Sequence, residues 1–299
     1  MLLDIQFQDS IKFLNAALIL AKDYSGNPKD NRIQAQSFDV LRLLLIAMKD
    51  TTTRLNKRLK TYSEKYYQEN ASVEEEVDWN NPLSKMSDTG LIMSDIWNLI
   101  DTTHRLGEIL KRMRFIPVST SFNNMLFEIK VIRDSYQHLD ERVRDFFGEE
   151  HCKDSVFGNI TWRFRPNKSQ VAFSFYLVSG ITFESIGIPP RDGTWITPSN
   201  FVDHEGVFDL NIMYVKRKGT VKDKSHESAT INIDNIVGQI NLLLPPIFKY
   251  CDRITEAWKS KYHNNEIVVR SGASWPMGFR FFIHSGDQMA FNIIPTSPD

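Results

Sequence analysis

The spacing of apolar residues changes along this chain near residue 150. Before that point they recur every three or four positions, the period of an amphipathic helix, and after it they alternate with polar residues, as in half-buried strands. No internal repeat or low-complexity tract interrupts either half. The change of period predicts two domains, at residues 1–150 and 151–299, a usual number for a chain of 299 residues.

Four helices are predicted in the first half, at residues 9–21, 37–66, 87–117 and 122–147. The turn at residues 25–28 contains a glycine and a proline and ends the first of them, and the polar, acidic segment 68–86 is predicted to be an exposed loop. Gly148 is expected to end the fourth. Amphipathic helices joined by modest connections indicate a helical bundle.

The second half is predicted to contain strands and one long helix. The strands are expected at residues 160–164, 171–178, 181–185, 208–215, 266–270, 279–283 and 289–294, and the helix at 234–262. Pro245 and Pro246 should break or kink that helix, because proline lacks a backbone N–H and clashes with the preceding turn. The predicted fold class is α+β: an N-terminal four-helix bundle, then a mainly antiparallel β-sheet domain with one long helix.

Composition narrows the function classes only a little. The formal net charge is −1, so the chain lacks the strongly basic balance typical of many nucleic-acid-binding proteins, although local patches matter more than the total. Cys152 and Cys251 form no disulfide framework and no zinc motif, which favours a reducing, cytoplasmic setting. Neither a signal peptide nor an apolar run of about 18 residues is apparent, and we expect no membrane association, cofactor or metal.

The residue types that best suit catalysis lie together in the predicted fourth helix, at positions 133–138. Arg133 carries a permanently charged fork that matches phosphate oxygens, and His138 can exchange a proton near neutral pH. Asp134 and His138 are four residues apart and share one helix face, which Arg142 continues. Arg133 lies about 140 degrees round the helix from His138, so both would meet one phosphate only in a cleft against another helix or subunit.

The pattern Arg133-Asp134-x3-His138 resembles the Arg-x4–6-His motif of HEPN domains, in which a polar residue often follows the arginine. The resemblance covers at most residues 1–150. It implies a helical bundle and a metal-independent ribonuclease, often in a toxin, anti-phage or RNA-processing setting, that works as a homodimer with facing motifs. It also implies that Arg133 steadies the scissile phosphate, His138 donates or accepts a proton, and Asp134 orients a partner.

Other residues are candidates for contacts with RNA. Arg142 and the pair His104-Arg105, which the third helix is positioned to present to the fourth, are predicted to bind substrate. Basic groups also cluster in three places, at residues 54–60, 111–114 and 216–224, where they could hold RNA phosphates. For each group the alternative is a solvated charged surface. The group at residues 111–114, at the end of the predicted third helix, could also simply complement the negative end of the helix dipole.

Two further classes of function stay open. The charged row on the fourth helix could consist only of i,i+3 and i,i+4 pairs on an exposed face, which would favour a non-enzymatic interaction or scaffold protein. A sensor is the third class, in which residues 151–299 bind a ligand or partner and gate the helical bundle. The expected partners are RNA, a second copy of the chain and an antitoxin or regulatory protein.

Overall fold

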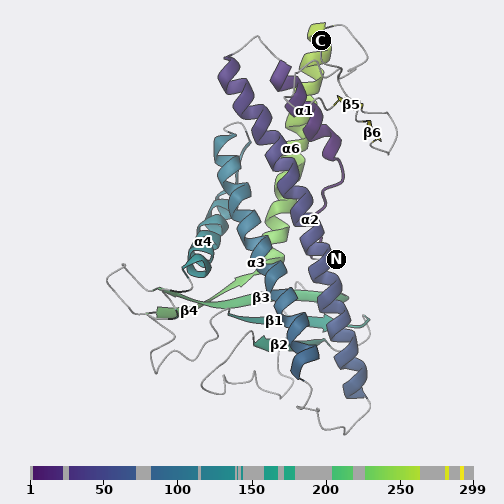
Figure 1. Ribbon diagram of the computed structural model, residues 1–299, viewed down its shortest axis with the longest axis vertical. Coiled ribbons are helices and arrows are strands. Elements are labelled where there is room, and N and C mark those ends of the chain that lie inside the picture. Colours follow the sequence, from purple (N-terminus) through teal and green to yellow (C-terminus); the bar gives the residue numbers. More distant parts are fainter. Residues whose placement is uncertain are drawn as a thin grey trace. The chain divides into compact units, whose positions relative to one another are not determined.

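The computed structural model describes residues 3–22, 27–71, 82–113, 116–138, 140, 143, 158–167, 172–178, 204–217, 226–262, 280–282 and 290–292. The predicted α+β class is confirmed, because among the elements described in full four helices come first along the chain, and an antiparallel sheet and one long helix follow (Figure 1). The chain forms two compact units. The first contains Met1–Ser10 and Val40–Ile247, and the second contains Ile11–Asp39 and Phe248–Asp299. This boundary does not coincide with residue 150, so a division there stays a prediction.

The helices α1 (Ser10–Lys22), α2 (Pro28–Ala71), α3 (Pro82–Arg112) and α4 (Thr120–Gln137) correspond to the four expected in the first half. The start of α2 differs from the prediction, because the helix begins at Pro28 rather than at residue 37. Proline suits the first position of a helix, and the Asn27 side chain accepts the Lys29 N–H at 3.0 Å. The proline that was predicted to help end one helix therefore begins the next, and Asn27 caps it.

The end of α4 also differs from the prediction. The helix begins after Ser119, whose hydroxyl accepts the Phe122 N–H at 3.1 Å, and it ends at Gln137 rather than at residue 147. His138 is the C-cap, with φ −103° and ψ 39°, and its N–H still donates to the Asp134 carbonyl at 3.3 Å. No glycine or proline marks this end, so periodicity could not place it. The candidate motif therefore occupies the last turn of α4, not its middle.

The long helix α6 (Ile233–Tyr262) follows the sheet and continues through both prolines, so they do not break it, and the alternative of a kink stays a prediction. Burial of apolar side chains around the prolines explains its continuity. Leu243, Leu244 and Ile247 are all at most 5% exposed. Burying such a side chain contributes roughly 1.5–3 kcal/mol, so the three together are comparable to the cost of about 3 kcal/mol for each of the two prolines.

Within the described residues, the sheet has four antiparallel strands in the order β2-β1-β3-β4. They are β1 (Asn159–Arg165), β2 (Phe173–Val178), β3 (Gly206–Arg217) and β4 (His226–Asn232). The sequence analysis did not predict β4, because His-Glu-Ser-Ala-Thr-Ile-Asn lacks a clear alternation. The short strands β5 (Arg280–Phe282) and β6 (Ala290–Asn292) pair with each other, and the strands expected at 181–185 and 266–270 lie outside the described residues.

Trp162 in β1 anchors the sheet to α2. Its side chain is 1% exposed, and its indole N–H donates to the Ser63 hydroxyl at 2.9 Å. The ring stacks on Phe175 of β2 at 5.1 Å between centroids and meets the edge of Tyr62 at 5.7 Å. These contacts bury a large aromatic side chain and satisfy its polar group, so they fix β1 and β2 against one helix.

A β-bulge in β3 lies opposite Trp162. The pairing of β1 with β3 shifts between Thr161 and Arg163, and Asp209 takes a left-handed φ of 54°. The shift directs the Leu210 N–H to the Asp234 carboxyl group in the first turn of α6, at 2.6 Å. The start of α6 is thus tied to the bulge through one buried acidic side chain, which is 8% exposed.

Candidate functional site

The third and fourth helices pack side by side and antiparallel, and this interface carries the candidate site (Figure 1). Trp97 of α3 stacks on Tyr136 near the end of α4, with ring centroids 4.1 Å apart and planes 15° apart. Farther along α3, Gly107 lies so close to Leu126 that an added Cβ would be 2.6 Å from both Leu126 methyl carbons. Between these contacts lie Asp101, His104, Arg105, Arg133 and Asp134, which we call the α3–α4 cluster.

Asp101 is the centre of the α3–α4 cluster. Its Oδ1 accepts a hydrogen bond from Arg133 Nε at 2.8 Å, and its Oδ2 accepts one from Arg105 Nε at 2.6 Å. Arg133 Nη1 also lies 3.9 Å from an oxygen of Asp134. Two guanidinium groups from different helices therefore converge on a single carboxylate. The Arg133 side chain is 21% exposed and that of Arg105 is 62% exposed, so the cluster opens to solvent on the Arg105 side.

The charges of the cluster alter the acidities of its members. Burial acts to raise the pKa of Asp101, but the hydrogen bonds from Arg133 and Arg105 outweigh it, and the pKa lies below its usual value. The pKa of His104 is lowered by burial and by the positive charge of Arg133, against smaller opposite effects from three acids. At neutral pH the carboxylate is thus ionised, while the imidazole is neutral and able to accept a proton.

The structure brings four of the six candidate residues into one cluster: Arg133, Asp134, His104 and Arg105. His104 lies within electrostatic reach of both Arg133 and Asp134, as expected if the third helix presents it to the fourth. The fifth candidate, His138, is exposed at the C-cap of α4. Arg142 lies outside the described residues.

Sequence reasoning missed Asp101, although it holds the cluster together. One signal was present, because Asp101 and Arg105 are four residues apart on one helix and form an i,i+4 pair. The decisive contact, with Arg133, joins residues 32 apart in the sequence. No local pattern could reveal that contact, since it depends on how α3 and α4 pack.

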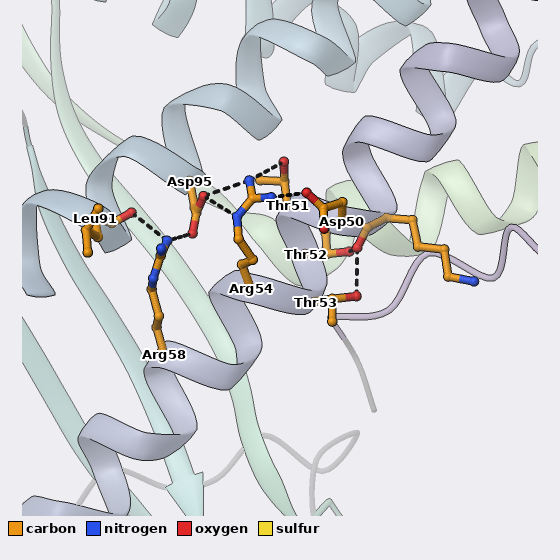
Figure 2. A network of polar contacts seen from close by, with 9 residues as sticks. Asp50, Thr51, Thr52, Thr53, Arg54, Arg58, Leu91 and Asp95 are labelled. Atoms are coloured by element: carbon orange, nitrogen blue, oxygen red, sulfur yellow. Dashed lines mark hydrogen bonds and ion pairs between the residues drawn. The ribbon is translucent and has the colours of Figure 1, made fainter.

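A second charged network lies between α2 and α3 (Figure 2). Asp95 is 3% exposed and accepts hydrogen bonds from Arg54, at 3.2 Å from Nη2, and from Arg58 Nη1. Arg54 also pairs with Asp50, and Arg58 Nη1 lies 3.4 Å from the Leu91 carbonyl. Two of the cations predicted as a possible RNA patch therefore neutralise a buried acid, which supports the structural interpretation of that basic group.

Comparisons with protein-family models, with curated proteins and with solved structures find no match for this chain. Among the residues described, no group of three or more His, Cys, Asp or Glu side chains is arranged to hold a metal ion. In the same residues, no helix is both long and apolar enough to cross a membrane.

Proposed function

We propose that this protein binds RNA at the α3–α4 cluster and cleaves it without a metal ion, as its resemblance to HEPN domains implies. One observation carries the proposal: Arg105 and Arg133, from two helices, direct their Nε groups at one anionic position, now filled by Asp101. Guanidinium groups bind phosphate oxygens through the same charge-assisted hydrogen bonds that they make with a carboxylate.

In the proposed reaction the 2′-hydroxyl oxygen of RNA attacks the adjacent phosphorus. A base takes the hydroxyl proton, the bond from phosphorus to the 5′-oxygen breaks, and an acid protonates that oxygen, leaving a 2′,3′-cyclic phosphate. Arg133 stabilises the charge that develops on the phosphate, where its partial burial makes the interaction stronger than in water. His138 transfers a proton, as the motif implies, and His104 is a second group able to accept one.

The resemblance also supplies the proposed setting. A homodimer would place two exposed His138 side chains, one from each α4, near a shared substrate. An antitoxin or regulatory partner, a defence role and a cytoplasmic location follow from the same resemblance and belong to this proposal.

A cleavage assay in EDTA with defined RNA tests the proposal. We expect the wild type to cleave RNA and the double variant Arg133→Ala/His138→Ala to lose at least about a hundredfold in rate, the usual contribution of a general acid or base. Lys29→Ala is the control, because it removes an exposed cation from the first turn of α2, outside the cluster and outside the basic groups considered for RNA binding. If the wild type is folded and cleaves no RNA, the proposed ribonuclease activity is refuted. If the double variant cleaves RNA as fast as the wild type, the assignment of the site to Arg133 and His138 is refuted.

A non-enzymatic interaction protein is the second candidate, and the pairing within the cluster favours it. Both oxygens of Asp101 are engaged by arginines, and in a protein of this kind the cluster would only join α3 to α4 and bind no RNA. On α4, Phe127 is 70% exposed and offers an apolar side chain to a partner. In that case Arg133→Ala would lower thermal stability and leave RNA binding unchanged. The sensor hypothesis for residues 151–299 stays a prediction.

A further inference from the structure

Asp101 occupies the position at which a phosphate would meet the two arginines. Each of its oxygens accepts one Nε–H, at 2.6 Å from Arg105 and 2.8 Å from Arg133. A phosphate group carries more negative charge than a carboxylate and accepts the same charge-assisted hydrogen bonds from guanidinium N–H groups. The carboxylate and a phosphate therefore compete for the same donors.

The surroundings make such an exchange physically possible. The Asp101 side chain is 36% exposed and the Arg105 side chain is 62% exposed, so water reaches both sides of this ion pair. Arg105 extends from the exposed side of α3, whereas Arg133 is 21% exposed and held between helices. An exposed ion pair is weak enough for an external anion to replace it, and the less exposed arginine keeps its place.

We propose that Asp101 is an intramolecular competitor that limits the affinity of the α3–α4 cluster for RNA phosphate. The inference rests on the proposed function, because it concerns the same arginines. In the resting protein the carboxylate holds both guanidinium groups in position and neutralises one of the two charges. Binding of RNA requires the Nε groups of Arg105 and Arg133 to exchange Asp101 for a phosphate oxygen. Removing the negative charge of Asp101 should therefore strengthen RNA binding.

The prediction is a higher affinity for Asp101→Asn. Two partly exposed ion pairs each correspond to a factor of about 1.4 to 5, so their removal as competitors should strengthen binding roughly twofold to twenty-fivefold. The freed arginines should also bind additional phosphates of the RNA. We expect the slope of log affinity against log salt to steepen by about 0.7 for each additional phosphate that is neutralised in single-stranded RNA.

Fluorescence anisotropy with a labelled 2′-O-methyl RNA measures binding apart from cleavage, since this RNA lacks the attacking hydroxyl. Glu108→Gln is the matched control, because it removes the same charge from the same helix while its hydrogen-bond partner is Lys111 and not an arginine of the cluster. We expect affinity and salt dependence to increase more in Asp101→Asn than in Glu108→Gln. Equal increases would overturn the inference, because net charge alone would then explain them.

Two further variants separate the possible failures. Arg133→Ala should weaken binding of the same RNA; if it does not, the proposed function itself fails. If Arg133→Ala weakens binding and Asp101→Asn does not strengthen it, only the competitor role fails. Asp101→Ser provides a second, smaller replacement. If neither Asp101 variant folds, the inference is overturned, because Asp101 is then required for the fold and cannot give up its bonds to the arginines to an RNA phosphate.

Discussion

Replacement of Asp234 by asparagine tests the account of the bulge in β3. One Asp234 oxygen accepts the Leu210 N–H at 2.6 Å, and the other is buried without a hydrogen-bond partner. Burial raises the pKa of Asp234 to about 7. The hydrogen bond from the Leu210 N–H acts to lower this pKa, and the negative charge of Asp209 acts to raise it further. Asparagine keeps the accepting oxygen and cannot ionise, so it removes the titration and preserves the bond.

The sign of the pH effect follows from the two pKa values of Asp234. In the folded protein the group titrates near 7, against 3.8 for an unperturbed aspartate, so between these values only the folded state holds the proton. Its contribution to the free energy of unfolding is fully present below pH 3.8 and is lost as the pH rises through about 7. From about pH 5 to about pH 8 the loss amounts to about 3 kcal/mol.

Urea unfolding of both proteins at these two pH values, followed by tryptophan fluorescence, measures the effect. The stability of Asp234→Asn relative to the wild type should rise by about 3 kcal/mol from the lower to the higher pH. Asp50→Asn is the control, because it removes a carboxylate that is 64% exposed in the same unit. If the wild type and Asp234→Asn lose stability in parallel, the buried carboxyl group does not titrate as argued, and the reasoning is refuted.

Three other substitutions test the packing of α3. Gly107→Ala should lower the free energy of unfolding by about 1–3 kcal/mol, because the added Cβ would meet a side chain of α4. Gly90→Ala, which has nothing within 4 Å of the added Cβ, should raise it by up to about 1 kcal/mol. Chemical denaturation measures both variants, and stabilisation by both would contradict the close approach of Gly107 to α4. Asp95→Ala should lower the free energy of unfolding by about 3 kcal/mol, because it leaves Arg54 and Arg58 without their shared buried carboxylate. Chemical denaturation measures this effect too, and a loss under about 0.5 kcal/mol would show that the network contributes little to stability.

The sequence predicted those elements whose apolar period is long and regular. The helical stripe Phe122, Met125, Ile129 and Ile132 is buried as expected, because each side chain faces the same side of α4. The end of the same helix was misplaced, since apolar spacing continues beyond His138 and no residue type there stops a helix. Periodicity thus identifies a buried face but not the position at which the chain leaves it.

The candidate site was predicted only as a set of residue types. Arg133, His104 and Arg105 were recognised because their chemistry suits phosphate, and the structure places them together. The central role of Asp101 was not predictable, because it arises from a tertiary contact across two helices. Similarly, the predicted break of α6 rested on the rule that proline interrupts a helix, and the burial of the side chains around the two prolines outweighed that local effect.

The segment at residues 3–7 has a consequence for the order in which the chain can fold during synthesis. Leu3, Ile5 and Phe7 are at most 3% exposed, and the side-chain amide of Asn241 bonds the backbone at Asp4 and Gln6, both at 2.8 Å. These contacts span about 235 residues, so once the segment has left the ribosome it waits roughly 10–50 seconds for its partner at ordinary elongation rates. Throughout that interval they are accessible to chaperones, and the first unit is completed only when α6 emerges.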